Sequence, residues 1–236
     1  MEKKVEFNVG KDTLRGLVFI PKGKGPFPGV ICFHGSGSDG ETQYEIAKYL
    51  SKKGILGFAF NFRGCGKSDG RFENQTIEMG QEDAKAGLGF FLSLAEVNKN
   101  RTGLYGSSFG GFWAAMLADK YKFKSLVLSA PAAYAPKILN KRHVDFVNEF
   151  NELRKDYEKS QSYKEIEKFS GNLLVAKCEL DDVLAPVMVE RYLEKSKLVK
   201  RKEEFIVKGA KHRISQYPQA KKILQKKIVE WFKETL

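Results

Sequence analysis

A serine lies between two glycines at a spacing that is typical of an activated nucleophile. Gly106-Ser107-Ser108-Phe109-Gly110 matches G-x-S-x-G, and it stands between an apolar, strand-like run and a helix-like run of small and apolar residues. On such a sharp turn the hydroxyl points out at the carboxyl edge of a sheet, and side chains at the flanking positions would collide with backbone. Ser108 is the predicted nucleophile. Ser107 is the neighbouring alternative, but it does not have a glycine two residues away on each side.

A second glycine-rich turn has the composition of an oxyanion hole. His34-Gly35-Ser36-Gly37 directly follows an apolar run. A tetrahedral intermediate needs two preorganised donors, usually the N–H after the nucleophile and an N–H from the loop after the third strand. The backbone N–H groups of Phe109 and Ser36 are therefore the predicted donors, the alternative being an ordinary strand-end turn. His34 is expected to hold this loop by hydrogen bonds rather than to act as a base.

A serine hydroxyl needs an adjacent base, and the chain has three histidines. His212 follows the last predicted strand, so it can reach the same sheet edge as Ser108. His143 lies among charged residues, which favours a solvated helix position. The base should be oriented by an acid, and in this arrangement the chain order is Ser, then Asp or Glu, then His. Asp181 is the predicted acid, with Asp182 as its competitor.

At this point the sequence resembles the α/β-hydrolase superfamily. Five stretches carry the resemblance: His34-Gly35, residues 61–70, residues 106–110, residues 179–186 and residues 209–212. Residues 61–70 resemble D-x-R-G-x-G-x-S-x-G, with Asn61 in place of the first aspartate. The acid loop departs from G-E-x-D-x-x-V-P, because Cys178 replaces the glycine and the proline is shifted by one position to Pro186. The choice between Asp181 and Asp182 therefore stays open.

The resemblance implies a serine hydrolase that forms an acyl-enzyme without a metal or an organic cofactor. The chain is similar to carboxylesterases, including feruloyl and cinnamoyl esterases, and to serine aminopeptidase-like and acylglycerol lipase-like members. We expect a small to medium carboxylic ester as substrate, with aryl or hydroxycinnamoyl esters among the candidates. A small-peptide peptidase, a thioesterase and a non-catalytic binding protein that keeps the fold are the alternatives. Tyr134 either lines an acyl or alcohol pocket or packs in the core.

These residues must be positioned by alternating strands and helices. Buried strands are predicted at residues 29–33, 55–60, 102–105, 125–129, 173–178 and 204–207, after a hairpin at 5–9 and 14–20. Helices are predicted at residues 42–53, 81–94, 109–119, 185–195 and 216–234. This alternation predicts an α/β fold with a mixed, mostly parallel sheet of about eight strands and helices on both faces.

One segment interrupts the alternation. Residues 131–171 are too long for a structureless loop in a compact domain, and Val144, Val147 and Leu153 follow a helical pattern. We expect a small helical, cap-like insertion over the carboxyl edge of the sheet. The whole of residues 1–236 is expected to form a single domain, as monomer or homodimer.

Composition restricts the possible partners. The net charge is +12, but residues 1–130 carry 18 Lys and Arg against 13 Asp and Glu, and residues 131–236 carry 23 against 16. Because the excess is spread along the chain, without interleaved aromatic residues, no nucleic-acid partner is predicted. The three cysteines, Cys32, Cys65 and Cys178, have neither disulfide nor zinc spacing, which favours a reducing, cytoplasmic setting. No apolar run is long enough to predict a membrane span.

Overall fold

The computed structural model describes residues 1–146 and 156–236 and contains one eight-stranded sheet. The strands lie in the spatial order β1-β2-β4-β3-β5-β6-β7-β8. Their bounds are β1 Glu2–Val9, β2 Asp12–Phe19, β3 Phe27–Phe33, β4 Leu56–Phe60, β5 Val97–Ser107, β6 Ser125–Ser129, β7 Asn172–Cys178 and β8 Arg201–Val207. β2 is antiparallel to both of its neighbours, and all pairs from β4 to β8 are parallel. The predicted mixed, mostly parallel sheet is confirmed.

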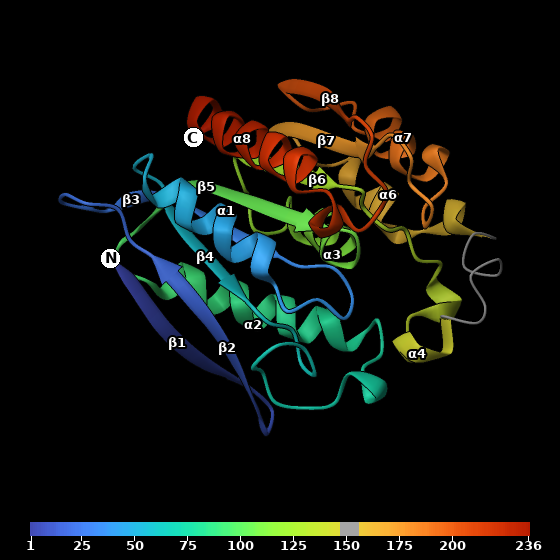
Figure 1. Cartoon of the computed structure of the whole chain (residues 1–236), viewed down its shortest axis with the longest axis horizontal. Helices are drawn as coiled ribbons and strands as arrows, with labels where there is room; N and C mark the ends of the chain where they lie inside the picture. The colour runs from blue at the N-terminus through green and yellow to red at the C-terminus, as the bar shows by residue number, and fades with distance from the viewer. Residues whose placement is uncertain (147–155) are drawn as a thin grey trace.

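Helices cover both faces of this sheet. Their bounds are α1 Glu41–Ser51, α2 Met79–Ser93, α3 Phe109–Leu117, α4 His143–Phe146, α6 Gln161–Ile166, α7 Pro186–Lys195 and α8 Pro218–Thr235. Apolar residues of α1 and α8 form the core on one face, and those of α2, α3, α6 and α7 form the core on the other. α1 and α8 lie side by side on their face (Figure 1).

The burial of the central strands explains why their residues are almost all apolar. Every residue of β4 and β6 is buried, as a strand covered on both faces requires. All nine residues of α3 are buried as well, which fits its composition of glycine, alanine and large apolar side chains. Because the carboxyl ends of parallel strands meet at one edge, the turns after β3, β5, β7 and β8 come together there. These four turns carry all of the predicted site residues.

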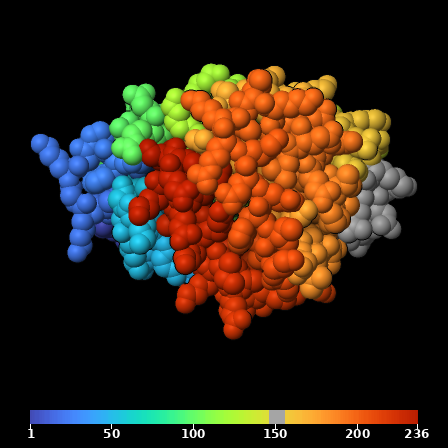
Figure 2. Space-filling model, turned by 90° about the horizontal axis from the view of Figure 1, so that it is seen from above, coloured from blue at the N-terminus to red at the C-terminus, as the bar shows by residue number. Residues whose placement is uncertain are grey.

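The described parts of segment 131–171 contain short helical pieces. They are the 3₁₀ turns Pro136–Ile138 and Tyr157–Lys159, together with α4 and α6. α6 packs against α3 and α7, and α4 contacts the 3₁₀ turn Phe72–Asn74. Figure 2 shows the part of this segment before residue 147, in yellow, at the end of the molecule away from the blue N-terminal hairpin. Of the predicted helical positions, Val147 and Leu153 lie outside the described residues.

Some element boundaries differ from the predicted ones. β5 begins at Val97 rather than at residue 102, and β8 begins at Arg201 rather than at residue 204. β8 is an edge strand, and charged residues are the usual protection of such an edge, so its first half does not look like a strand in the sequence. α8 begins at Pro218, because proline is favoured in the first turn of a helix.

None of the helices in the described ranges combines the length and apolarity needed to cross a membrane.

Candidate active site

Ser108 lies at the junction of β5 and α3, on the predicted sharp turn. Its backbone has φ 50° and ψ −115°, a strained conformation for a residue with a side chain. A Cβ atom built on Gly106 would lie 2.3 Å from the carbonyl oxygen of Gly110, and one built on Gly110 would lie 2.5 Å from that of Phe33. Both contacts are far too short, so the two flanking glycines are a steric requirement of this turn.

Three predicted site residues that are distant in the sequence meet at the sheet edge. The Ser108 hydroxyl lies 2.9 Å from His212 Nε2, and His212 Nδ1 lies 2.9 Å from Asp181 Oδ2. The imidazole is 11% exposed and the carboxylate 5%, so both contacts are largely shielded from water. When Nδ1–H donates to the carboxylate, Nε2 is left to accept the proton of the hydroxyl. This is the geometry that an activated serine needs.

The turn after β7 fixes the carboxylate of Asp181. Its Oδ1 accepts hydrogen bonds from the backbone N–H groups of Val183 and Leu184, at 2.9 and 2.8 Å. Oδ2 is then directed at His212. The competing Asp182 accepts a 3.4 Å hydrogen bond from the His212 backbone N–H, and its side chain is 51% exposed beside Lys211. The carboxylate in contact with the imidazole therefore belongs to Asp181.

The predicted oxyanion loop, residues 34–37, lies against Ser108. A Cβ atom built on Gly35 would be 3.4 Å from the Ser108 Cβ, so the loop backbone passes close to the serine. Ser36, next along the chain, is exposed, whereas the Phe109 side chain is buried in the core. The two residues predicted as donors thus belong to two separate elements next to the serine, the loop after β3 and the first turn of α3.

The buried His34 side chain makes polar contacts that hold the loop after β3, which carries the predicted oxyanion donor Ser36. His34 accepts a 3.0 Å hydrogen bond from the Phe62 N–H at Nε2, and its Nδ1 lies 2.7 Å from the Gly35 carbonyl. Burial lowers the pKa of His34 to about 4, so the ring is neutral at physiological pH. Cys65, in the neighbouring stretch 61–70, is also buried, and burial raises the pKa of its thiol to about 11. The expectation that His34 holds this loop is confirmed.

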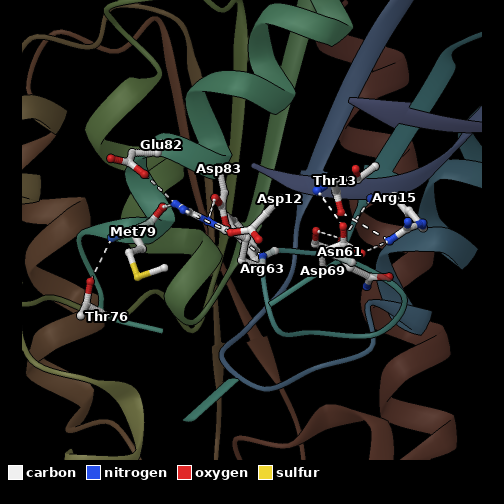
Figure 3. Close-up of polar contacts among 12 residues, drawn as sticks. Asp12, Thr13, Arg15, Asn61, Arg63, Asp69, Thr76, Met79, Glu82 and Asp83 are labelled. Carbon is white, nitrogen blue, oxygen red and sulfur yellow. Dashed lines mark hydrogen bonds and ion pairs between the residues drawn. The ribbon is translucent and has the colours of Figure 1, made fainter. Parts of the chain in front are cut away.

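The stretch from Asn61 to Gly70 ties the oxyanion loop to the rest of the fold. Asn61 donates to the Asp39 carbonyl at 2.6 Å and accepts from the Tyr44 hydroxyl at 2.9 Å. Two residues later, Arg63 is anchored to α2 (Figure 3). Both its backbone N–H and its Nε donate to the fully buried Asp83, at 2.8 and 2.6 Å, and Nη2 donates to Glu82 at 2.7 Å.

The Arg63 anchor predicts a large difference between two neighbouring acids. Asp83→Ala should lower the free energy of unfolding by about 3 kcal/mol, because it leaves the Nε–H of a largely buried guanidinium and a buried backbone N–H without their acceptor. Glu82→Ala is the matched control: its carboxylate binds the same guanidinium but is 63% exposed, so the loss should stay below about 1 kcal/mol. Urea unfolding followed by circular dichroism measures both. Equal losses would contradict this account of the anchor.

His143 is the residue that sequence reasoning misplaced. It was expected at a solvated helix position, but it is only 6% exposed, and burial lowers its pKa to about 4. Its Nδ1 lies 3.0 Å from the Ser36 hydroxyl, and its ring packs on Phe109. The charged neighbours that suggested solvation do face outward, since Arg142 and Asp145 pair with each other at 2.8 Å. No spacing in the sequence indicates that the residue between them turns inward.

The remaining predicted residues pack in the core. The Tyr134 ring meets Phe112 and Phe109 edge-on, with centroids 5.0 and 6.4 Å apart. It therefore packs against the core, which is one of the two roles predicted for it. Cys32 and Cys178 are buried in strands as small apolar residues. Within the described ranges, the acidic, histidine and cysteine side chains do not gather into a set that could hold a metal ion.

Comparison with known families and structures agrees with this architecture. Residues 26–153, a little over half of the chain, match the family model described as "Serine aminopeptidase, S33". The chain belongs to this family. The family matches the serine aminopeptidase-like resemblance drawn from the sequence motifs, and the match spans the predicted oxyanion loop and the serine turn but ends before Asp181 and His212.

Curated relatives align with part of the chain. Esterase EstD of Thermotoga maritima is 28% identical over 137 residues, which cover 54% of this chain and 32% of the relative. The uncharacterized protein YfhR of Escherichia coli O157:H7 is 26% identical over 145 residues, covering 58% of this chain and 49% of the relative. The chain thus aligns with a third to a half of the length of these two relatives.

Solved structures match over nearly the whole chain. Est1E of Butyrivibrio proteoclasticus, determined with ferulic acid bound, superposes with a TM-score of 0.77 at 18% identity and covers 98% of both chains. A monoacylglycerol lipase of Paleococcus ferrophilus gives a TM-score of 0.71 at 22% identity, covering 94% of this chain and 99% of the other. At these identities the likeness establishes the α/β-hydrolase fold alone.

Proposed function

We propose that this chain is a serine hydrolase that cleaves carboxylic esters through an acyl-enzyme on Ser108. The observation that carries the proposal is the unbroken line of hydrogen bonds from Asp181 through His212 to the Ser108 hydroxyl, with 2.9 Å at both contacts. This arrangement supplies a nucleophile, a base and an orienting acid at one sheet edge. The family match and the esterases among the similar proteins support it.

Acylation follows from these positions. The Ser108 oxygen attacks the ester carbonyl carbon while His212 Nε2 takes the hydroxyl proton. The backbone N–H groups of Ser36 and Phe109 stabilise the oxyanion of the tetrahedral intermediate, a contribution worth about 10²–10³ in rate for each donor. His212 then returns the proton to the leaving alkoxide, and the alcohol departs. The acyl group is left as an ester of Ser108.

Deacylation repeats the same steps with water. His212 removes a proton from a water molecule, and the resulting hydroxide attacks the acyl carbon. When the second intermediate collapses, the proton on His212 passes to the Ser108 oxygen, and the carboxylic acid is released. One ester and one water molecule give one acid and one alcohol, without a metal or an organic cofactor in the scheme.

The proposed substrate is a small to medium carboxylic ester, with aryl and hydroxycinnamoyl esters included. The ferulic acid in the Est1E structure supports including hydroxycinnamates. Two alternatives also have support: the family description names a serine aminopeptidase, and the thioesterase domain of the curacin pathway superposes with a TM-score of 0.68 at 13% identity. All three reactions share the acyl-enzyme and differ in the leaving group.

A panel of matched leaving groups tests the proposal. We expect p-nitrophenyl butyrate to be hydrolysed with a kcat/KM at least about 100 times that of the corresponding p-nitroanilide, because p-nitrophenolate is a better leaving group than the nitrogen of p-nitroaniline. Butyryl thioester and methyl ferulate complete the panel. Amide turnover above ester turnover would replace the proposal with a peptidase. No turnover and no labelling by a fluorophosphonate probe would indicate a non-catalytic protein.

A further inference from the structure

His143 is held in place from several sides. Its backbone N–H donates to the Gln75 carbonyl at 2.9 Å, and the Ile77 N–H donates to the Lys141 carbonyl at 3.3 Å. The ring stacks on Phe72, with centroids 5.5 Å apart and 20° between the planes. Residues 141–143 are thereby held against the chain before α2, and the imidazole is fixed in position and orientation.

The same imidazole touches both residues whose N–H groups are the proposed oxyanion donors. Nδ1 lies 3.0 Å from the Ser36 hydroxyl, on the loop after β3. The ring also meets the Phe109 ring edge-on, with centroids 4.7 Å apart and 82° between the planes. Ser36 is exposed at the tip of its loop, whereas Phe109 begins α3 in the core. The His143 side chain bridges these two separate elements.

We infer that His143 is a positioning residue. It sets the distance between the two oxyanion donors by forming a hydrogen bond with the Ser36 side chain and packing against the Phe109 ring. The inference rests on the proposed ester hydrolysis and adds to it a role for segment 131–171. The backbone near Ser36 needs such a constraint, because Gly35 and Gly37 flank it. Donors must lie about 2.7–3.1 Å from the oxyanion, and an error of about 1 Å can cost about 10²-fold.

The contribution of His143 is one of position and not of charge. Its ring is buried, and a neutral imidazole adds no positive charge beside the oxyanion. The ring contacts the Ser36 hydroxyl and the Phe72 and Phe109 rings, so it acts through the residues that carry the donors. Loss of the contact should therefore lower kcat, where the oxyanion forms, more than it changes KM.

Two substitutions separate the hydrogen bond from the ring. His143→Phe keeps an aromatic ring against Phe109 but cannot bind the Ser36 hydroxyl. His143→Asn loses the ring but keeps a polar atom at the place of Nδ1. With p-nitrophenyl butyrate we expect His143→Phe to lower kcat about tenfold with KM within about twofold, and His143→Asn to recover most of that loss. Arg142→Ala, one residue away and exposed, is the matched control and should retain the wild-type kcat.

A double-mutant cycle closes the test. Ser36→Ala removes the hydroxyl, keeps the backbone N–H, and should lower kcat about tenfold by itself. It should cost nothing more in the His143→Phe background, because the two changes remove the same contact. If His143→Phe fails to fold, Ser36→Ala at its exposed position still gives the kcat measurement. A wild-type kcat in either single variant, equal losses for Phe and Asn, or additive losses would overturn the inference. Absence of turnover and of fluorophosphonate labelling in the wild type would instead overturn the proposed function, and the inference with it.

Discussion

Ser108→Ala is expected to reduce p-nitrophenyl butyrate turnover by at least about 10⁴-fold. The hydroxyl of this residue lies 2.9 Å from His212 Nε2, so its removal leaves the base without a nucleophile to activate. The residual rate should come from the oxyanion donors and substrate binding alone. The variant should keep its fold, because alanine retains the Cβ atom at φ 50° and removes one oxygen atom. Steady-state kinetics and a thermal unfolding curve measure both properties.

Ser107→Ala is the matched control for that experiment. Ser107 is the last residue of β5 and precedes the strained residue Ser108, so its side chain leaves the backbone at a different position. We expect Ser107→Ala to retain turnover within about threefold and to remain reactive toward a fluorophosphonate probe, whereas Ser108→Ala should not label. Equal turnover by wild type and Ser108→Ala would contradict the nucleophile assignment, as would labelling that disappears with Ser107.

The fold could be predicted from the sequence because its central strands are buried on both faces. Continuous apolar runs such as 29–33 and 125–129 have no solvent face, so pattern and structure coincide there. The edge strand β8 shows the reverse case. Its alternation of exposed and half-buried residues begins with Arg201 and Lys202, and charged residues there weaken the strand pattern. Local composition therefore located the interior of the sheet more accurately than its boundary.

The candidate site divides in the same way. The serine turn could be predicted because steric limits require glycine at positions 106 and 110, and this requirement appears in the sequence as a motif. The Arg63–Asp83 contact and the burial of His143 have no corresponding sequence motif, because both depend on contacts between segments that are distant along the chain. Whether a polar residue faces water or a buried partner depends on which segment packs over it. That information is in the three-dimensional arrangement and not in local spacing.

The choice between two adjacent acids yields the second large prediction. Asp181→Asn is expected to lower kcat by about 10³–10⁴-fold. Because Oδ1 of Asp181 accepts hydrogen bonds from the Val183 and Leu184 N–H groups, an asparagine oxygen should remain there and its NH₂ group should face His212 Nδ1. That NH₂ group can only donate, so it favours the tautomer with the proton on Nε2. In this tautomer His212 cannot accept the proton of Ser108.

Asp182→Asn makes the comparison decisive, since it changes the same charge one residue along. Its carboxylate is 51% exposed, and its contact with His212 is a 3.4 Å hydrogen bond to the backbone and not to the imidazole. An asparagine oxygen can still accept that bond, so turnover should stay within about threefold of wild type. Rates of p-nitrophenyl butyrate hydrolysis by the two variants, measured side by side, test the assignment. A larger loss in Asp182→Asn than in Asp181→Asn would transfer the orienting role to Asp182, and the hydrogen-bonding argument from Val183 and Leu184 would fail with it.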